Sequence, residues 1–133
     1  MKTNKLLISL SVIALLTSFT LYQQEKKPWN IPDKYKKMTN TYTDDMDDLL
    51  DYGADLYDKH CASCHGDDGI GDGPKADDLK TYPGDFTSDE FKEHSEGDAY
   101  YMSIIGRDEM PNFEKKIPDE EGRWAVIAYI REF

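Results

Sequence analysis

The pentapeptide Cys61-Ala62-Ser63-Cys64-His65 constrains this chain more than any other feature, because it contains both cysteines and follows them directly with a histidine. Side chains three or four residues apart on a helix share a face, so cysteines at this spacing can reach the two vinyl groups on one edge of a porphyrin. The histidine, four residues after the first cysteine, then points at the iron as its proximal ligand. The motif therefore predicts one covalently bound haem c with its iron.

Three other kinds of site use cysteines at this spacing. A zinc site needs four ligands, and only His60 and His94 are available to complete a set. A thioredoxin-like redox pair follows a strand in a βαβ unit, whereas the residues before Cys61 have a helical pattern. A disulfide between residues three apart in a helix strains the bond geometry. The motif favours haem attachment over all three.

The N-terminal residues have the features of an export signal. Lys2 and Lys5 precede an apolar run over 6–21, whose last third is diluted by polar residues. The run is slightly shorter than the ~20 residues that span a bilayer as a helix. The best match to a small-x-small cleavage site is Ser18-Phe19-Thr20, which is a weak match. Residues 1–22 are therefore predicted to be a signal peptide or a membrane anchor, which places the protein in the periplasm or on the outer face of the cytoplasmic membrane.

The rest of the chain divides into a polar segment and one small domain. Residues 23–42 are polar, contain prolines and lack periodicity, which is typical of a linker or extended arm. Residues 43–133 form one domain, which at about 90 residues buries little surface unless a cofactor completes its core. The net charge is −11, and it becomes −13 when Lys2 and Lys5 leave with the leader. Such acidity disfavours nucleic acid and favours redox partners with basic docking patches, or only keeps the protein soluble.

The domain has helical patterns and no convincing strand. Thr43 is the predicted N-cap of a first helix, because four aspartates follow it and suit the positive end of the helix dipole. Gly53 within this helix indicates a close helix contact, since glycine there costs about 1 kcal/mol relative to alanine. Ser88 is a predicted cap, and Gly106 a predicted stop. The predicted helices follow Thr43, cover 88–94 and about 97–105, and begin near Pro118. The fold class is therefore all-α.

Residues from about 47 to 133 resemble a class I c-type cytochrome, the bacterial mono-haem domain. Three features occur in the order of that family. The haem motif comes first, a Met-Pro-Asn-Phe sequence follows at 110–113, and a C-terminal helix reads Arg-Trp-Ala-Val-Ile-Ala-Tyr-Ile from Arg123. The resemblance implies a cytochrome c-like fold of about four helices packed around one haem.

The resemblance also implies contacts around the haem. The first and last helices of the family cross through a glycine and an aromatic residue. The matching residues are Gly53 and Tyr57 on the first helix and Val126 and Tyr129 on the last. A proline carbonyl of the family accepts a hydrogen bond from the proximal imidazole, and Pro74 is the matching position for His65. Such partners orient a ligand and tune the metal.

Met110 is the predicted sixth ligand of the iron. It lies in a non-helical stretch 45 residues after His65, and Pro111 beside it presets the backbone so that the thioether can approach the distal face. Met102 competes with it, but lies on the apolar stripe of a helix, where methionine is usually part of the core. His94 or an open position is the alternative. A methionine ligand suits electron transfer because it raises the potential of haem iron.

Three weaker features near the motif have structural interpretations. The acidic, glycine-rich segment 67–73 lacks the distal glutamate of a calcium loop, and is predicted to be a turn-rich loop at the haem edge. His60 is predicted to lie on the surface, pointing away from the haem. Arg107 pairs with a haem propionate or is an exposed charge.

Two ligands on iron leave no position for a substrate. The sequence also contains no catalytic triad, carboxylate pair or nucleotide-binding loop. It therefore predicts an electron carrier rather than an enzyme, which transfers single electrons between a membrane or periplasmic donor and an acceptor of a respiratory chain. The alternatives are a cytochrome subunit fixed in a dehydrogenase or oxidase complex, to which residues 29–40 could bind, and a haem enzyme or gas sensor with a labile sixth ligand.

Overall fold

The computed structural model describes residues 27–133, and this part of the chain consists of helices and turns with one isolated bridge and no strand. The predicted leader at 1–22 lies outside the described residues. The helices are α2 (Asp33–Lys36), α3 (Met46–His60), α4 (Ala62–His65), α5 (Asp89–Lys92), α6 (Glu96–Tyr100) and α7 (Glu120–Ile130), with a 3-10 turn η2 (Ala76–Asp78) and a π-helical turn η3 (Tyr101–Ile105). The predicted all-α class is confirmed. Over residues 27–133, no helix is both long and apolar enough to cross a membrane.

The long helix α3 begins later than a cap at Thr43 predicts. Asp45 is its N-cap, because the Asp45 carboxylate accepts a hydrogen bond from the amide of Asp48 at 3.2 Å. A carboxylate is also favoured at the positive end of the helix dipole, where the threonine hydroxyl offers no charge. The buried residues of α3 are Leu49, Gly53 and Tyr57. Their spacing of four places one narrow stripe of the helix against the core.

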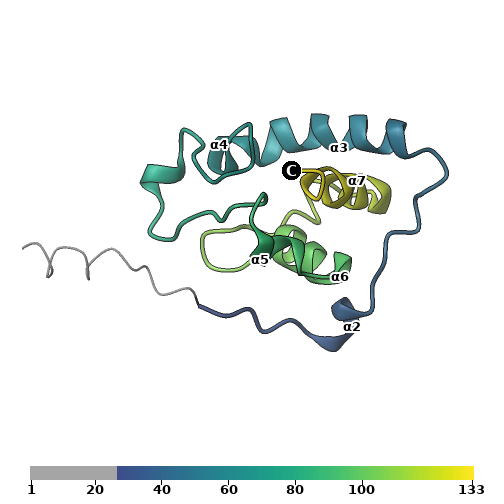
Figure 1. The fold of residues 1–133 in the computed structure, drawn as a ribbon, viewed down its shortest axis with the longest axis horizontal. Helices are drawn as coiled ribbons and strands as arrows, with labels where there is room; N and C mark the ends of the chain where they lie inside the picture. Colours follow the sequence, from purple (N-terminus) through teal and green to yellow (C-terminus); the bar gives the residue numbers. More distant parts are fainter. Residues whose placement is uncertain (1–26) are drawn as a thin grey trace, which may run out of the picture.

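The helix α7 lies beneath α3 in Figure 1, and the two backbones touch at Gly53. A Cβ atom at Gly53 would lie 2.7 Å from the carbonyl carbon of Ala125 and 2.8 Å from the Cβ of Tyr129. The predicted close helix contact is therefore confirmed. Its partner differs by one position, because Ala125 rather than Val126 faces the glycine. The rings of Tyr57 and Tyr129 lie 5.4 Å apart and close the crossing on one side.

Replacing Gly53 with alanine is expected to destabilise the fold. Alanine favours a helix by about 1 kcal/mol, but overpacking costs about 1–3 kcal/mol. The clash is with the backbone of Ala125, which cannot rotate away as a side chain can. We therefore expect a net loss of up to about 2 kcal/mol in the free energy of unfolding, measured by denaturant titration of the haem-loaded protein. Asp55→Ala, at an exposed position of the same helix, is the control and should be close to neutral. A Gly53→Ala variant about 1 kcal/mol more stable than the wild type, as helix propensity alone predicts, would contradict the contact.

The shorter helices begin and end at polar caps. The hydroxyl of Ser88 accepts a backbone amide at 3.3 Å and starts α5, as predicted. Ser95 and Asp98 form a reciprocal capping box at the start of α6. The chain continues from α6 into η3, and Gly106 ends it with a φ of 70°, as predicted. α7 starts after Asp119, whose carboxylate accepts a backbone amide, rather than at the preceding proline.

The described part of the predicted arm, residues 27–42, packs on the domain beside α6. Ile31 is only 8% exposed, and the ring of Tyr35 lies 4.7 Å from that of Tyr101. Gly97 lets the arm approach closely, since a Cβ there would lie 2.9 Å from the carbonyl carbon of Tyr35. The arm is thus part of the folded domain. Its apolar residues have irregular spacing in a polar stretch, which is why periodicity did not reveal them.

The core is one apolar cluster between the helices. The ring of Trp124 in α7 lies 4.8 Å from that of Tyr100 in α6. Met102 is 8% exposed within η3, as predicted for a methionine of the core. The cluster extends to Ala62 of the cysteine motif and to Phe86. The motif therefore rests on the main core of the protein.

Candidate cofactor site

The cysteine motif occupies the junction between α3 and α4. The amide of Cys61 donates to a carbonyl of α3 at 2.8 Å and so caps the end of that helix. The carbonyl of Cys61 then accepts the amides of Cys64 and His65, both at 3.0 Å. The three residues therefore form a single helical turn. At this spacing their side chains share a face, as the motif predicts.

Both cysteines are free and partly buried. Burial, together with the neighbouring thiol of Cys64, raises the pKa of Cys61 to about 12. The thiol of Cys61 is therefore protonated at neutral pH, unlike the low-pKa thiolate of a thioredoxin-like site. Across residues 27–133, no three side chains of His, Cys, Asp or Glu gather closely enough to hold a metal ion by themselves. Neither the redox pair nor the zinc site finds support in this geometry.

His65 is held rigidly in an apolar environment. Its side chain is 5% exposed and stacks on the ring of Phe86, with the ring centroids 4.6 Å apart and an interplanar angle of 19°. Burial lowers the pKa of His65 to about 4, so its imidazole is neutral at pH 7, which is the form that binds a metal. Phe86 was not among the predicted site residues. It lies alone in a polar loop, where no periodicity indicates a role.

The loop after the motif folds back over it through backbone hydrogen bonds. The carbonyl of His65 accepts the amide of Gly71 at 2.8 Å, and the buried hydroxyl of Tyr57 donates to the carbonyl of Gly66 at 2.7 Å. Three glycines of this loop have positive φ, which L side chains rarely adopt. The segment 67–73 is thus a turn-rich loop beside His65, as predicted.

The predicted contact between Pro74 and His65 is not formed in this structure. The Nδ1 atom of His65 is buried and lacks a hydrogen-bond partner among residues 27–133. The residues on either side of Pro74 instead bond to the motif. The amide of Gly73 donates to the carbonyl of Cys64 at 3.2 Å. The amide of Lys75 donates to the carbonyl of Ser63 at 2.8 Å. These bonds hold Pro74 beside the motif, in an exposed position.

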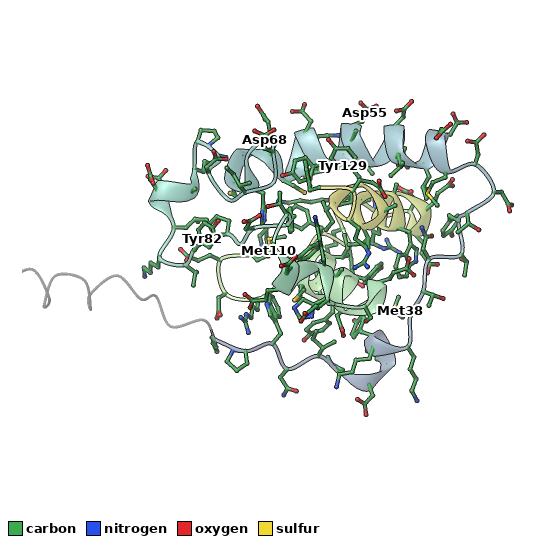
Figure 2. The ribbon with its side chains drawn as sticks, viewed as in Figure 1. Met38, Asp55, Asp68, Tyr82, Met110 and Tyr129 are labelled. Atoms are coloured by element: carbon green, nitrogen blue, oxygen red, sulfur yellow. The ribbon has the colours of Figure 1, made fainter. Side chains whose placement is uncertain are left out.

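Met110 follows a tight turn in the loop between η3 and α7. Its amide donates to the carbonyl of Arg107 at 2.8 Å, and Asp108 within the turn has a φ of 50°. Gly106 precedes the turn, and a Cβ there would lie 2.8 Å from the carbonyl oxygen of Pro111. The side chain of Met110 is partly buried against the main core cluster. In the view of Figure 2 it lies below α4, toward the middle of the domain.

Two contacts link this loop to the cysteine motif. The ring of Phe113, three residues after Met110, lies 6.0 Å from that of His60, which precedes Cys61. The thiol-bearing Cys61 and the thioether of Met110 also pack against the same apolar cluster. The structure thus places Cys61 and Met110 against one apolar cluster, and His65 stacks on Phe86 of the same cluster.

A comparison with models of known protein families matches residues 50–133, well over half of the chain, to Cytochrome c. The chain belongs to the cytochrome c family. No curated protein matches the chain. The cofactor of the family is haem c, which is attached covalently and contains iron, and the predicted cofactor is thereby confirmed. Haem-based electron transfer follows from the family, and a cytochrome domain fits an electron carrier.

The site of this cytochrome fits such a group. Free thiols at Cys61 and Cys64 are available for two thioether bonds, and a neutral imidazole at His65 can bind iron. The unpaired Nδ1 atom of His65 is costly in an apolar site, since an unsatisfied buried polar atom costs about 1–3 kcal/mol. A buried polar atom without a partner therefore calls for a functional explanation. Binding of haem iron by His65 supplies that explanation.

One prediction about a neighbour of the cytochrome site was wrong. His60 is half-buried rather than on the surface, because the aromatic ring of Phe113 covers it, and burial lowers its pKa. Arg107 is half-buried rather than exposed, and its pairing with a haem propionate stays a prediction. Its guanidinium lies 3.7 Å from the ring centroid of Trp29 and donates to the carbonyl of Pro28 at 2.8 Å. His94, the alternative to Met110 as iron ligand, lies just after the end of α5. Its backbone carbonyl accepts a hydrogen bond from the guanidinium of Arg131 at 2.8 Å.

Proposed function

We propose that this cytochrome is an exported mono-haem electron carrier, in which Cys61 and Cys64 form thioethers with haem c and His65 and Met110 bind its iron. One observation carries the proposal: a buried, neutral imidazole lies on the same helical turn as two free thiols, and it stacks on Phe86 of the apolar cluster against which Met110 also packs. A methionine and a histidine together make a six-coordinate iron of raised potential. Such a site exchanges electrons and has no open position for a substrate.

The side chains of the site have separate roles in this proposal. The bound haem supplies the one-electron chemistry. Phe86 stacks on His65 and fixes the orientation of its ring, so that the ligand does not move when the charge of the site changes. The buried hydroxyl of Tyr57 holds the loop that closes over His65. A dry and rigid surround lowers the cost of reorganisation when an electron arrives or leaves.

The spectrum of the oxidised protein tests this function. A thioether on ferric haem iron gives a methionine-to-iron charge-transfer band, and we expect this band in the protein as isolated. The protein should also bind cyanide slowly, since Met110 must first leave the iron. Absence of the band combined with immediate cyanide binding would contradict the carrier and favour a haem enzyme or gas sensor.

The position of the arm bears on the alternative of a permanently bound subunit. That alternative uses residues 29–40 as the contact with a larger complex. In the structure, the large side chains of this segment, including Trp29, Ile31 and Tyr35, pack on the cytochrome domain itself. No partner is needed to cover them, which supports a free carrier.

Export is the second part of the proposal. It is supported by Lys2 and Lys5 before the apolar run, and it would place the carrier in the periplasm or on the outer face of the membrane. There it would pass electrons from a membrane or periplasmic donor to a respiratory acceptor. The intact mass of the exported protein separates the two versions. Loss of about 20 residues would indicate a cleaved signal peptide, and the full mass a retained anchor.

We expect the rate of electron exchange with a basic redox partner to fall steeply with ionic strength. The net charge is −11, and exposed aspartates of α3 such as Asp55 point outward, away from α7 (Figure 2). Their field accelerates encounter with a positive surface, and salt screens it over about 10 Å at 0.1 M. Stopped-flow rates should also be higher with cationic than with anionic small redox reagents of similar potential. Rates that do not change with salt would mean that the acidity serves solubility only.

A further inference from the structure

The first described residues of the arm contact the turn that carries Met110. The guanidinium of Arg107 lies over the ring of Trp29 and donates hydrogen bonds to the carbonyls of Lys27 and Pro28. The ammonium of Lys27 lies 3.6 Å from the carboxylate of Asp108. Two successive residues of the turn are therefore held by a segment that is about 80 residues away in sequence.

The opposite side of the same turn is held by the loop that follows the cysteine motif. The carboxylate of Glu109 accepts the amides of Lys80 and Thr81, both at 3.0 Å, and the hydroxyl of Thr81 at 2.6 Å. These hydrogen bonds lower the pKa of Glu109, the Thr81 hydroxyl being the largest cause. Each of the three residues before Met110 is thus bound to a part of the chain outside its own loop.

The turn needs such support because its backbone is strained. Asp108 has a φ of 50°, in the left-handed region that a residue other than glycine rarely adopts unless its surroundings enforce it. The arm can enforce it because the arm is itself fixed. The ring of Trp29 packs edge-on against Tyr101 of η3 at 6.2 Å, and Ile31 is buried two residues later.

We propose that residues 27–29 are a strap that positions Met110 and slows its departure from the iron. Trp29 and the backbone carbonyls before it hold Arg107. The fixed turn then positions the thioether of Met110, three residues after Arg107, toward the haem iron. Trp29 and Arg107 are positioning residues, since neither is a ligand. This inference rests on the proposed role of Met110 as the distal ligand.

The test uses the full-length, haem-loaded protein carrying Trp29→Ala. Two measurements report on the strap. The first is amide hydrogen exchange at Met110 and Phe113, whose amides donate to carbonyls at 2.8 Å, relative to exchange at Cys61 in the motif. The second is the rate at which imidazole binds to the ferric protein, which is limited by loss of Met110. A cation–π contact of this kind predicts that both rise by about three- to tenfold.

Two further variants make the result specific. Trp29→Phe keeps an aromatic face for the guanidinium of Arg107 and should restore most of the wild-type behaviour. Leu49→Ala removes a buried side chain of α3 that lies outside the core cluster on which Met110 packs, so we expect it to lower overall stability without releasing the strap. In Leu49→Ala, exchange should rise by the same factor at all three amides.

Three results would overturn the strap. The first is unchanged exchange at Met110 and Phe113 in Trp29→Ala. The second is faster exchange at these amides with an unchanged rate of imidazole binding. The third is faster exchange in Leu49→Ala that is confined to Met110 and Phe113, as in Trp29→Ala. The charge-transfer band of the wild-type protein tests the ligand role of Met110 separately, so a failed strap is distinguishable from a wrong ligand.

Discussion

A variant that lacks both thiols, Cys61→Ala with Cys64→Ala, is expected to release all of its haem into acidified organic solvent, whereas the wild-type protein retains its haem after the same extraction. Without thioether bonds, the haem is held only through its iron ligands and apolar contacts. Acid protonates the imidazole of His65 and the solvent removes the apolar contribution. The measurement is the absorbance of haem in the organic phase relative to that in the protein precipitate.

Single-cysteine variants refine this result. Cys61→Ala and Cys64→Ala each leave one thiol on the shared helical face, and one thioether bond is enough to keep haem with the protein during extraction. Each single variant should therefore retain its haem, with an absorption spectrum shifted by the one unreacted vinyl group. Release of haem from the wild-type protein would show that the attachment at this motif is wrong.

The sequence predicted the features of the fold that only certain residue types allow, such as a close helix contact or a helix end. Gly53 stands in a helical pattern at a cost, and the structure shows the backbone of α7 against it. Ser88 and Gly106 mark helix ends through a hydroxyl acceptor and a positive φ. Such requirements are local, so a pattern of a few residues is enough to predict them.

Other features depend on which distant segments meet, and local patterns do not contain that information. The apolar residues of the arm follow no period, and their burial depends on the close approach of the arm backbone to Gly97. Phe86 is one aromatic residue in a polar loop, and becomes the stacking partner of His65 only because its own amide donates to the carbonyl of Gly69 at 2.9 Å. The burial of His60 likewise depends on Phe113, which is more than 50 residues away.

Met110 can serve as a stable ligand only if the turn before it is held in place, which is the role proposed for the strap. A methionine in a mobile loop would exchange with water or buffer ligands, and the potential would then drift with conditions. In this cytochrome the strained turn before Met110 is held by the arm on one side and by Thr81 on the other. Both contacts are at the turn, so retention of the predicted ligand Met110 should be separable from stability of the fold.

The variant Met110→His is expected to lose the methionine-to-iron charge-transfer band and to have a much lower midpoint potential. A thioether stabilises ferrous over ferric iron, whereas a second imidazole donates more strongly and favours the ferric state. The fall should be a sizeable part of the roughly 0.8 V over which axial ligands tune haem iron. Potentiometric titration of the purified protein gives the potential, and the oxidised spectrum gives the band.

The competing side chains supply the controls for this experiment. Met102 is buried in η3, so Met102→Leu conserves volume and should cost less than about 1.5 kcal/mol in stability, with band and potential nearly unchanged. His94→Asn should leave both unchanged as well. If His94 bound the iron in place of Met110, the wild-type protein would be a bis-histidine haem and would have no methionine-to-iron charge-transfer band. If Met102→Leu abolished the band while Met110→His preserved it, the distal ligand would be Met102. Loss of the band only in Met110→His, with its potential lowered, is the result that the packing of the two methionines leads us to expect.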